Sequence, residues 1–290
     1  MNLAKIIQQG LSKVVCKIDE QLVSMHILKP RIVRYMDGGI CSQMHMYAAG
    51  HYYSRQGFDV YYDLGWFKYS GKDLDGNAPR VWELQAMFPN LEVKTLSKFQ
   101  TWFFKKFLLF RPDGSLVPKV DTIRRSMYLT GYLGVEWKEK DNPYNTIYTQ
   151  STMNTPKKLA QSACTYCGVH VRRGDLANVN IKGYGTVTDG YFLRAINYVQ
   201  SRYKDVKFLF FSDDLAWVEE NIVPDIQTPY ELVKGNKAYE DLGLLAQCPI
   251  IVASQGSFGK VAARLNPQAT LIMCDNEYAI RTRPNTILIK

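Results

Sequence analysis

The sequence has few of the residues that build metal centres and disulfide frameworks. It contains six cysteines and four histidines in 290 residues. Cys164 and Cys167 have the Cys-x-x-Cys spacing, but the sequence has no second such pair and no cluster of histidines, so a zinc site is not indicated. Several cysteines lie in apolar stretches, where a buried free thiol is the expected state. The pattern predicts reduced cysteines and a reducing compartment.

Long hydrophobic runs are also missing. The sequence has no stretch of about eighteen apolar residues, the length that a membrane-spanning helix needs. The N-terminal stretch "MNLAKIIQQGLSKVVCKIDEQL" lacks the small-residue cleavage site of a signal peptide. We therefore expect a cytoplasmic protein, which could also bind peripherally to the inner face of the plasma membrane.

The composition is that of a globular protein with excess positive charge. Hydrophobic residues make up 46% and charged residues 22%, as in ordinary folded soluble proteins. Lysine and arginine outnumber aspartate and glutamate by 36 to 27, for a net charge of +9. This excess favours an anionic partner such as a nucleotide, a nucleic acid or an acidic membrane surface.

The second half of the sequence alternates between strand and helix patterns. Strands are expected at 167–171, 206–214, 249–254 and 269–275, and helices at 188–203, 215–223, 238–248 and 258–266. Such alternation predicts an α/β fold with a doubly wound parallel sheet, in which ligands gather at the carboxyl ends of the strands.

The first half is less regular, although it begins in the same way. We expect a strand at 31–36, a glycine turn at 37–43, a helix at 44–57 and a strand at 58–64. The polar segment 142–162 contains two prolines and is the best linker candidate. We therefore predict a first α/β domain at 1–155, a second at 156–275, and a tail at 276–290 that could pack back on the first domain.

The motif "HVRRGD" follows directly on the expected strand at 167–171. The planar guanidinium group of an arginine can bind two phosphate oxygens at once. In an extended segment His170 and Arg172 share one side and Arg173 takes the other, so the two arginines should have different roles. Asp175 could orient an arginine. The alternative is a solvated turn.

Three further segments place polar groups at turns beside expected strands. Asp213 and Asp214 end the strand at 206–214, where a carboxylate could accept two N–H groups of guanine or cap a helix. The small-residue turn at 255–258 precedes a helix, whose first N–H groups can bind an anion. The glycine turn at 37–43 repeats this construction in the first half.

The order of these segments resembles the α-1,2-fucosyltransferases. The likeness is carried by "GGICSQMHMYAAG", "TGYLGVEW", "VHVRRGDL", "FLFFSDDLAWVEENI", "YEDLGLLAQCPIIVAS" and "GSFGKVAARLN", and it runs from about Arg31 to Asp275. The resemblance implies inverting transfer from GDP-β-L-fucose and a GT-B architecture, in which two Rossmann-like domains face each other across a cleft. It also implies that 1–155 is the acceptor-side domain and that 156–275 is the nucleotide-sugar-binding domain, which holds most of the donor. No metal or other cofactor is expected to be required.

The resemblance also implies roles for particular residues. Arg172 would hold the donor phosphates and stabilise the charge on departing GDP, with Asp175 supporting it. Asp37, beside the glycine turn, is the candidate base for the acceptor hydroxyl by its location. The expected donor-binding residues are His170, Arg172, Arg173, Asp175, Asp213, Asp214, Gln255, Gly256, Ser257, Phe258, Gly39 and Gln43.

Two segments depart from the family pattern. Cys41-Ser42-Gln43 stands where the family has Gly-Asn-Gln, and Ser257-Phe258-Gly259-Lys260-Val261 stands where it has Ser-Phe-Ser-Trp-Trp. These departures bear on the donor sugar and the acceptor.

The resemblance predicts transfer of fucose to O2 of galactose in a cell-surface glycan, such as the O-antigen of lipopolysaccharide. A non-catalytic or altered-donor member of the fold is one alternative. A basic nucleic-acid-binding protein is another, but the sequence lacks a dedicated motif or dense basic stripe. Asp73 and Asp75 have the spacing of a Mn²⁺ site, although a solvated turn is the simpler interpretation.

Two segments could contact a membrane and so meet a lipid-linked acceptor. The stretch 99–114 interleaves aromatic residues with Lys105, Lys106 and Arg111. It could be a buried helix with snorkelling lysines or a membrane-surface patch. The segment 3–18 has apolar residues at helical spacing together with lysines, and it could pack on the domain or touch a membrane.

Overall fold

The computed structural model describes residues 3–72, 76, 79–110, 120–130, 147–148, 152–160, 162–174, 189–276, 279–281 and 283–290. The chain divides into two compact units. Unit 1 comprises Met1–Gly71, Arg80–Trp82 and Asn90–Gln150, and unit 2 comprises Lys72–Pro79, Glu83–Pro89 and Ser151–Lys290. Among the described residues, no helix is both long enough and apolar enough to span a membrane.

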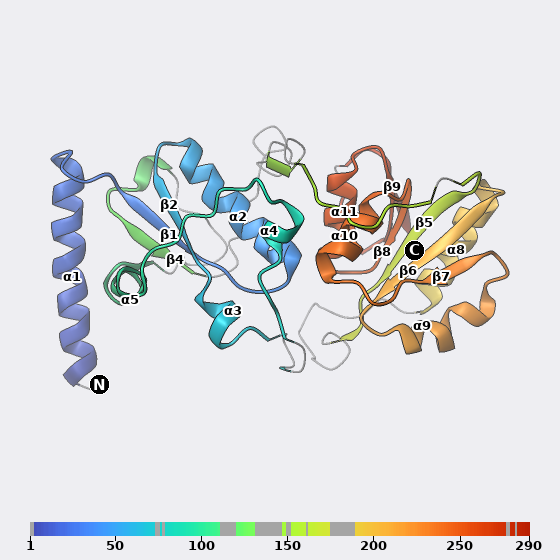
Figure 1. The fold of residues 1–290 in the computed structure, drawn as a ribbon, viewed down its shortest axis with the longest axis horizontal. Helices are drawn as coiled ribbons and strands as arrows, with labels where there is room; N and C mark the ends of the chain where they lie inside the picture. The colour runs from blue at the N-terminus through green and yellow to red at the C-terminus, as the bar shows by residue number, and fades with distance from the viewer. Residues whose placement is uncertain are drawn as a thin grey trace. The chain divides into compact units, whose positions relative to one another are not determined.

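Unit 1 contains a four-stranded parallel sheet in the order β2-β1-β4-β3 (Figure 1). The strands are β1 (Arg31–Tyr35), β2 (Asp59–Asp63), β3 (Leu109–Phe110) and β4 (Met127–Leu129), and the helices are α1 (Leu3–Ser24), α2 (Ile40–Arg55), α3 (Gly65–Tyr69), α5 (Lys98–Phe107) and the 3₁₀ turn η1 (Val120–Thr122). The helix predicted at 44–57 therefore begins four residues earlier, directly after Gly39.

Helices α5 and α1 pack outside one face of the unit 1 sheet. Val33 and Tyr128 of the sheet form a buried cluster with Phe104 of α5, and Val15 and Cys16 of α1 pack against it. The α5 helix begins at a capping box, in which the side chains of Ser97 and Gln100 each bond the other's backbone N–H. A buried apolar face and a strong cap thus fix α5 against the sheet.

Unit 2 contains a six-stranded parallel sheet in the order β10-β9-β8-β5-β6-β7. The strands are β5 (Thr165–Val171), β6 (Val206–Ser212), β7 (Tyr230–Leu232), β8 (Ile250–Ala253), β9 (Thr270–Cys274) and β10 (Thr286–Ile289). The helices are α4 (Leu84–Met87), α8 (Asp189–Arg202), α9 (Leu215–Asn221), α10 (Ala238–Ala246) and α11 (Phe258–Leu265), with the 3₁₀ turn η3 (Val223–Asp225).

Alternate residues of β5 face opposite layers of helices. Val169 and Val171 join a fully buried core that includes Phe192 and Ile196 of α8. Gly168 faces the other side, where a Cβ atom would lie 2.3 Å from Leu245 of α10. Burial on both faces explains why β5 and β6 read as continuous apolar runs.

The predicted α/β fold with parallel sheets is confirmed, and each strand predicted in the second half is present. Residues 286–289 of the predicted tail form β10, which pairs with β9 and so belongs to the sheet of unit 2. Segments 72–79 and 83–89, predicted within the first domain, group with unit 2.

Candidate functional site

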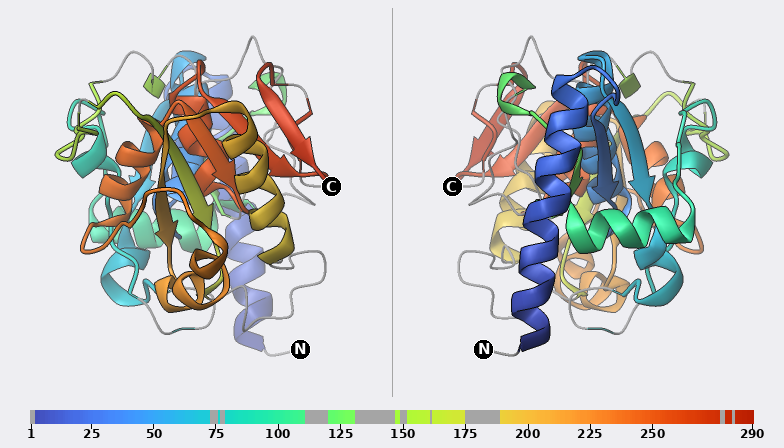
Figure 2. Two further views of the ribbon diagram at one scale, coloured as in Figure 1. Left: turned by 90° about the vertical axis from the view of Figure 1, so that its right-hand side faces the viewer. Right: turned by 90° about the vertical axis from the view of Figure 1, so that its left-hand side faces the viewer.

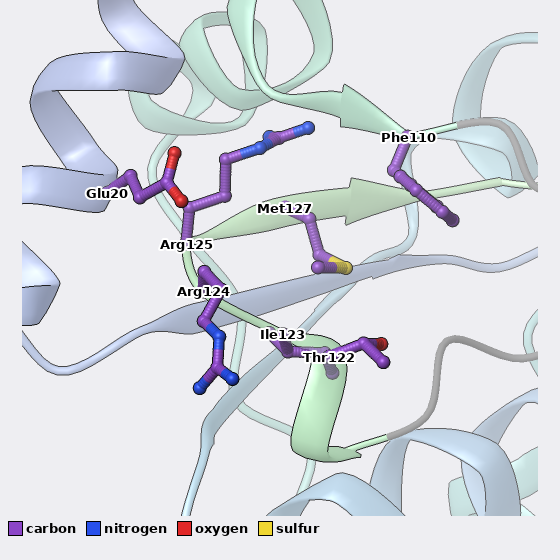
Figure 3. Close-up of a pocket in the computed structure, with 7 residues that line it drawn as sticks. All are labelled: Glu20, Phe110, Thr122, Ile123, Arg124, Arg125 and Met127. Atoms are coloured by element: carbon purple, nitrogen blue, oxygen red, sulfur yellow. The ribbon is translucent and has the colours of Figure 1, made fainter.

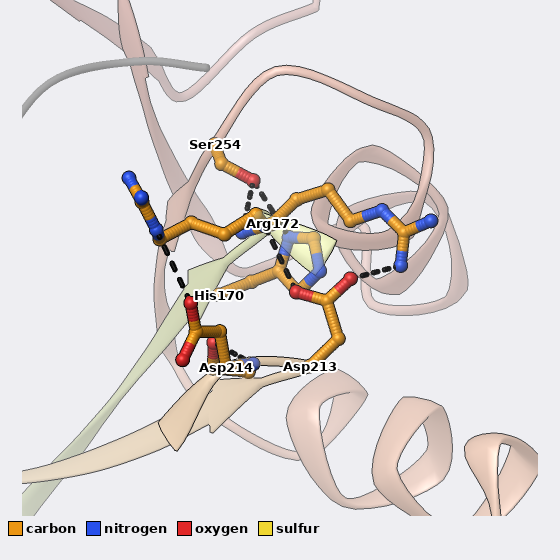
Figure 4. Close-up of polar contacts among 7 residues, drawn as sticks. His170, Arg172, Asp213, Asp214 and Ser254 are labelled. Atoms are coloured by element: carbon orange, nitrogen blue, oxygen red, sulfur yellow. Dashed lines mark hydrogen bonds and ion pairs between the residues drawn. The ribbon is translucent and has the colours of Figure 1, made fainter. Parts of the chain in front are cut away.

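The carboxyl ends of β5, β6 and β8 bring together most of the predicted donor-binding residues of unit 2 (Figure 4). His170 is 7% exposed at the end of β5. Its Nδ1 lies 3.1 Å from the hydroxyl of Ser254, and its ring stacks on Phe258 at 4.9 Å between centroids. Burial, assisted by the nearby charge of Arg172, lowers the pKa of His170 to about 3. The imidazole is therefore neutral near pH 7 and brings no positive charge to the site.

Asp213 fixes the turn that carries Arg172. One carboxylate oxygen accepts a hydrogen bond from Arg172 Nη1, and the other accepts the backbone N–H of Arg173 at 2.8 Å. The backbone N–H of Arg172 donates to the hydroxyl of Ser254 at 3.1 Å. A Cβ atom on Gly174 would lie 2.5 Å from the Asp213 carboxylate. The turn thus fits closely around Asp213.

The neighbouring Arg173 makes a separate set of contacts. Its guanidinium carbon lies 4.0 Å from the centroid of the Trp217 ring, and its Nε lies 3.5 Å from a carboxylate oxygen of Asp214. Asp214 also accepts the backbone N–H of Trp217 at 3.2 Å and so caps α9. Arg172 and Arg173 thus pair with different carboxylates, Asp213 and Asp214. These contacts give Arg173 a structural role, and its predicted donor contact stays a prediction.

The turn at 255–258 carries the start of α11 to the carboxyl end of β8. Gly256 has a φ of +95°, a conformation that other residues adopt only with strain. A Cβ atom on Gly259 would lie 2.5 Å from the Cβ of Ala253, so glycine allows α11 to pack closely on β8. Gln255 and Phe258 are half-buried and Ser257 is exposed. Anion binding at this turn stays a prediction.

In unit 1 the glycine turn follows β1. Gly38 has a φ of +74°, and Gly39 precedes α2. Gln43 is fully buried, and its Nε2 donates to the carbonyl oxygens of Gly38 at 3.2 Å and Val81 at 2.8 Å. The buried Gln43 side chain therefore stabilises the turn by hydrogen bonds. The predicted contact between Gln43 and the donor stays a prediction.

Asp37 and its neighbours form a charged group at the same turn. Burial raises the pKa of the Asp37 carboxyl, and the opposing effect of Arg34 is smaller. The nearby Asp63 accepts the hydroxyl of Tyr128 at 2.6 Å and the backbone N–H of Gly65 at 2.8 Å. A carboxyl whose pKa is raised toward neutral pH suits a general base.

Sequence reasoning missed three contributors. Ser254 bonds both His170 and the backbone of Arg172, and Trp217 covers Arg173. Arg80 Nη1 lies 3.8 Å from the position of a Cβ on Gly39, although no motif marks this arginine. The small Ser254 at the end of an expected strand was the one available signal.

Some predictions fall outside the described residues, namely those for Asp175, Asp73, Asp75 and Arg111. Within the described part of the chain, no group of three or more histidine, cysteine or acidic side chains could hold a metal ion. A cavity of about 310 Å³ lies elsewhere in unit 1 (Figure 3). It is lined by Glu20, Phe110, Thr122, Ile123, Arg124, Arg125 and Met127.

The fold is similar to that of solved fucosyltransferase structures. The α-1,6-fucosyltransferase NodZ co-crystallised with GDP superposes with a TM-score of 0.51 at 14% sequence identity, covering 86% of this chain and 96% of that one. NodZ soaked with GDP-fucose gives a TM-score of 0.50 at 14% identity. At this identity the likeness establishes the fold alone.

Sequence relatives and a family description agree on the family. The chain is 25% identical over 250 residues to the α-1,2-colitosyltransferase of Escherichia coli, covering 78% of this chain and 84% of that protein. It is 35% identical over 127 residues to the mouse galactoside 2-α-L-fucosyltransferase Sec1, covering 42% of this chain and only 33% of that protein. The sequence model of one glycosyl transferase family matches residues 127–283, which is more than half of the sequence. The chain belongs to glycosyl transferase family 11.

Proposed function

We propose that this protein transfers L-fucose from GDP-β-L-fucose to a hydroxyl of a glycan, with O2 of a galactose-type acceptor as the target. The family supports sugar transfer. The single observation that carries the donor assignment is the Arg172 turn, which presents a guanidinium at the carboxyl end of a parallel sheet. The O2 position rests on the names of the α-1,2-transferring relatives.

The proposed reaction is a direct displacement with inversion. The acceptor hydroxyl loses its proton to Asp37 as its oxygen bonds to the anomeric carbon of the sugar. The bond from that carbon to the phosphate oxygen breaks, and its electron pair leaves with GDP. Arg172 stabilises the negative charge that develops on the departing diphosphate, so that no metal ion is required for this purpose. The β-linked donor thus yields an α-linked product.

Colitose is a second candidate donor sugar. It is L-fucose without the 3-hydroxyl group, and the bacterial relative that matches most of the chain is named for its transfer. A site that hydrogen-bonds a hydroxyl discriminates strongly against an analogue that lacks it. The ratio of kcat/KM for the two GDP-sugars therefore decides between them.

The test is a transfer assay with purified protein, EDTA and a panel of acceptors, galactosides and lipid-linked glycans among them. GDP-fucose, GDP-colitose, GDP-mannose and UDP-galactose compete as donors. Transfer from GDP-fucose without metal supports the proposal. A requirement for Mn²⁺ and a UDP-sugar would eliminate it, and GDP binding with neither hydrolysis nor transfer would identify a non-catalytic member of the fold.

A further inference from the structure

The α1 helix has two different faces. Ser12, Cys16 and Asp19, at helical spacing, face the unit: their side chains bond the backbone of Lys106, Phe107 and Ser126. A second stripe at the same spacing contains Ile7, Leu11, Val14 and Ile18, which are 55%, 51%, 56% and 51% exposed. This apolar stripe has no cover within the described part of the chain.

The α5 helix, which packs against α1, has exposed apolar residues of its own. Phe99 and Trp102 are 70% and 48% exposed, and their rings stack on each other. The right-hand view of Figure 2 shows α1 and α5 side by side on one side of unit 1. We call the surface formed by the α1 stripe together with Phe99 and Trp102 the α1–α5 face.

The charge around the α1–α5 face is predominantly positive. Lys13 and Lys17 flank the stripe on α1, and Lys98 and Lys106 lie beside the aromatic pair. Lys106 Nζ lies 4.9 Å from the centroid of the Trp102 ring. In addition, Arg124 and Arg125 line the cavity next to α1 together with Glu20 of that helix, which leaves a positive excess there (Figure 3).

We propose that the α1–α5 face binds the surface of an anionic membrane. An apolar stripe lying in the interface, aromatic rings at headgroup depth and a rim of lysines are the combination that such surfaces attract. A second copy of this chain fits less well for two reasons. It would bring the lysines of the two faces close together, and Phe99 and Trp102 would lie outside the contact between the two α1 helices. The inference does not depend on the donor or acceptor proposed above.

The test is co-sedimentation of the full chain with vesicles of phosphatidylcholine alone or with about one-third phosphatidylglycerol. We expect binding only to the anionic vesicles, weakened by salt. Leu11→Glu/Ile18→Glu should abolish it. Each of Lys13→Gln and Lys17→Gln should weaken it about fivefold, since a lysine near an anionic surface contributes about 1 kcal/mol. Tyr230→Glu, an exposed aromatic position on unit 2, is the matched control and should bind as the parent does.

Circular dichroism and an unchanged Tm would show that the α1 variant is folded, so that lost binding cannot be ascribed to unfolding. Equal binding to neutral and anionic vesicles, or none to either, would overturn the proposal. So would a concentration-dependent dimer in analytical ultracentrifugation that Leu11→Glu/Ile18→Glu dissolves, because a second copy would then cover the face.

Discussion

Arg172 and Arg173 are adjacent in sequence but are expected to differ sharply when each is replaced. We expect Arg172→Ala to weaken GDP binding and Arg173→Ala to leave it nearly unchanged. The reason is the different surroundings of the two guanidinium groups. Arg173 is engaged by the ring of Trp217 and by Asp214. Arg172 pairs with Asp213 directly after the end of β5, where its planar guanidinium suits a phosphate ligand.

The magnitude follows from the exposure of the Arg172 side chain. A charge-assisted hydrogen bond contributes about 1.5–3 kcal/mol. The side chain is 24% exposed, so we take the lower end of that range, which corresponds to a roughly tenfold to thirtyfold increase in Kd. Arg172→Lys should recover only part of the affinity, because a point charge cannot reproduce the planar fork.

Isothermal titration calorimetry with GDP and with guanosine, in EDTA, measures the effect. Guanosine has no phosphate, so the parent and the Arg172 variants should bind it equally. A loss of affinity for both ligands would point to a damaged turn instead of a missing phosphate contact. The reasoning is refuted if Arg172→Ala and Arg173→Ala bind GDP equally well.

The remaining predictions concern Asp37, His170 and Gly259. Asp37→Asn should lower kcat by about 10²–10⁴ with little change in donor affinity. It should also remove the acid limb of the pH–rate profile. In the parent protein the midpoint of that limb should lie above the usual carboxyl pKa, because burial raises the pKa of Asp37. Because the pKa of His170 is about 3 in the folded protein, against 6.5 for an unperturbed histidine, its burial should cost about 1.4 kcal/mol of stability per pH unit as pH falls from 6.5 toward 3. Urea titrations of His170→Gln should show a shallower loss over that window, and an unchanged slope would contradict the cause. Gly259→Ser should cost about 1–3 kcal/mol and lower Tm by several degrees, since its Cβ would press on Ala253; Gly10→Ala, with open space around it, is the control and should not lower Tm.

The sequence predicted the long, buried elements of the fold well and the short ones poorly. Strands such as Val206–Ser212 are continuous apolar runs bounded by polar turns, and this pattern has few other interpretations. β3 and β7 have two and three residues, too few for any period to show. β10 is half-exposed throughout, and its place beside β9 depends on tertiary pairing alone.

In the candidate site, too, the sequence predicted the residues but not the contacts between segments far apart in the chain. The motif located Arg172 and Arg173, and alternation along the strand predicted that their side chains diverge. It could not reveal that the partner of Arg172 lies 41 positions away at Asp213, or that Ser254, 84 positions from His170, bonds both His170 and the backbone N–H of Arg172. These partners are set by the order of strands β8, β5 and β6 in the sheet, which local pattern does not determine.

The pairing of Arg172 with Asp213 changes how donor binding should be understood. The guanidinium is neutralised and oriented by a carboxylate that also bonds the backbone of Arg173. If Arg172 binds the donor as we propose, a phosphate would share or displace one bond of an oriented cation, at a lower entropic cost than the capture of a mobile one. Asp213→Asn would remove the negative charge that balances Arg172, and it would leave the guanidinium of Arg172 less well oriented. Nonspecific anion binding should then increase, and the preference for GDP over other anions should fall. A variant in which anion binding and the preference for GDP both increased would show that Asp213 only competes with the donor.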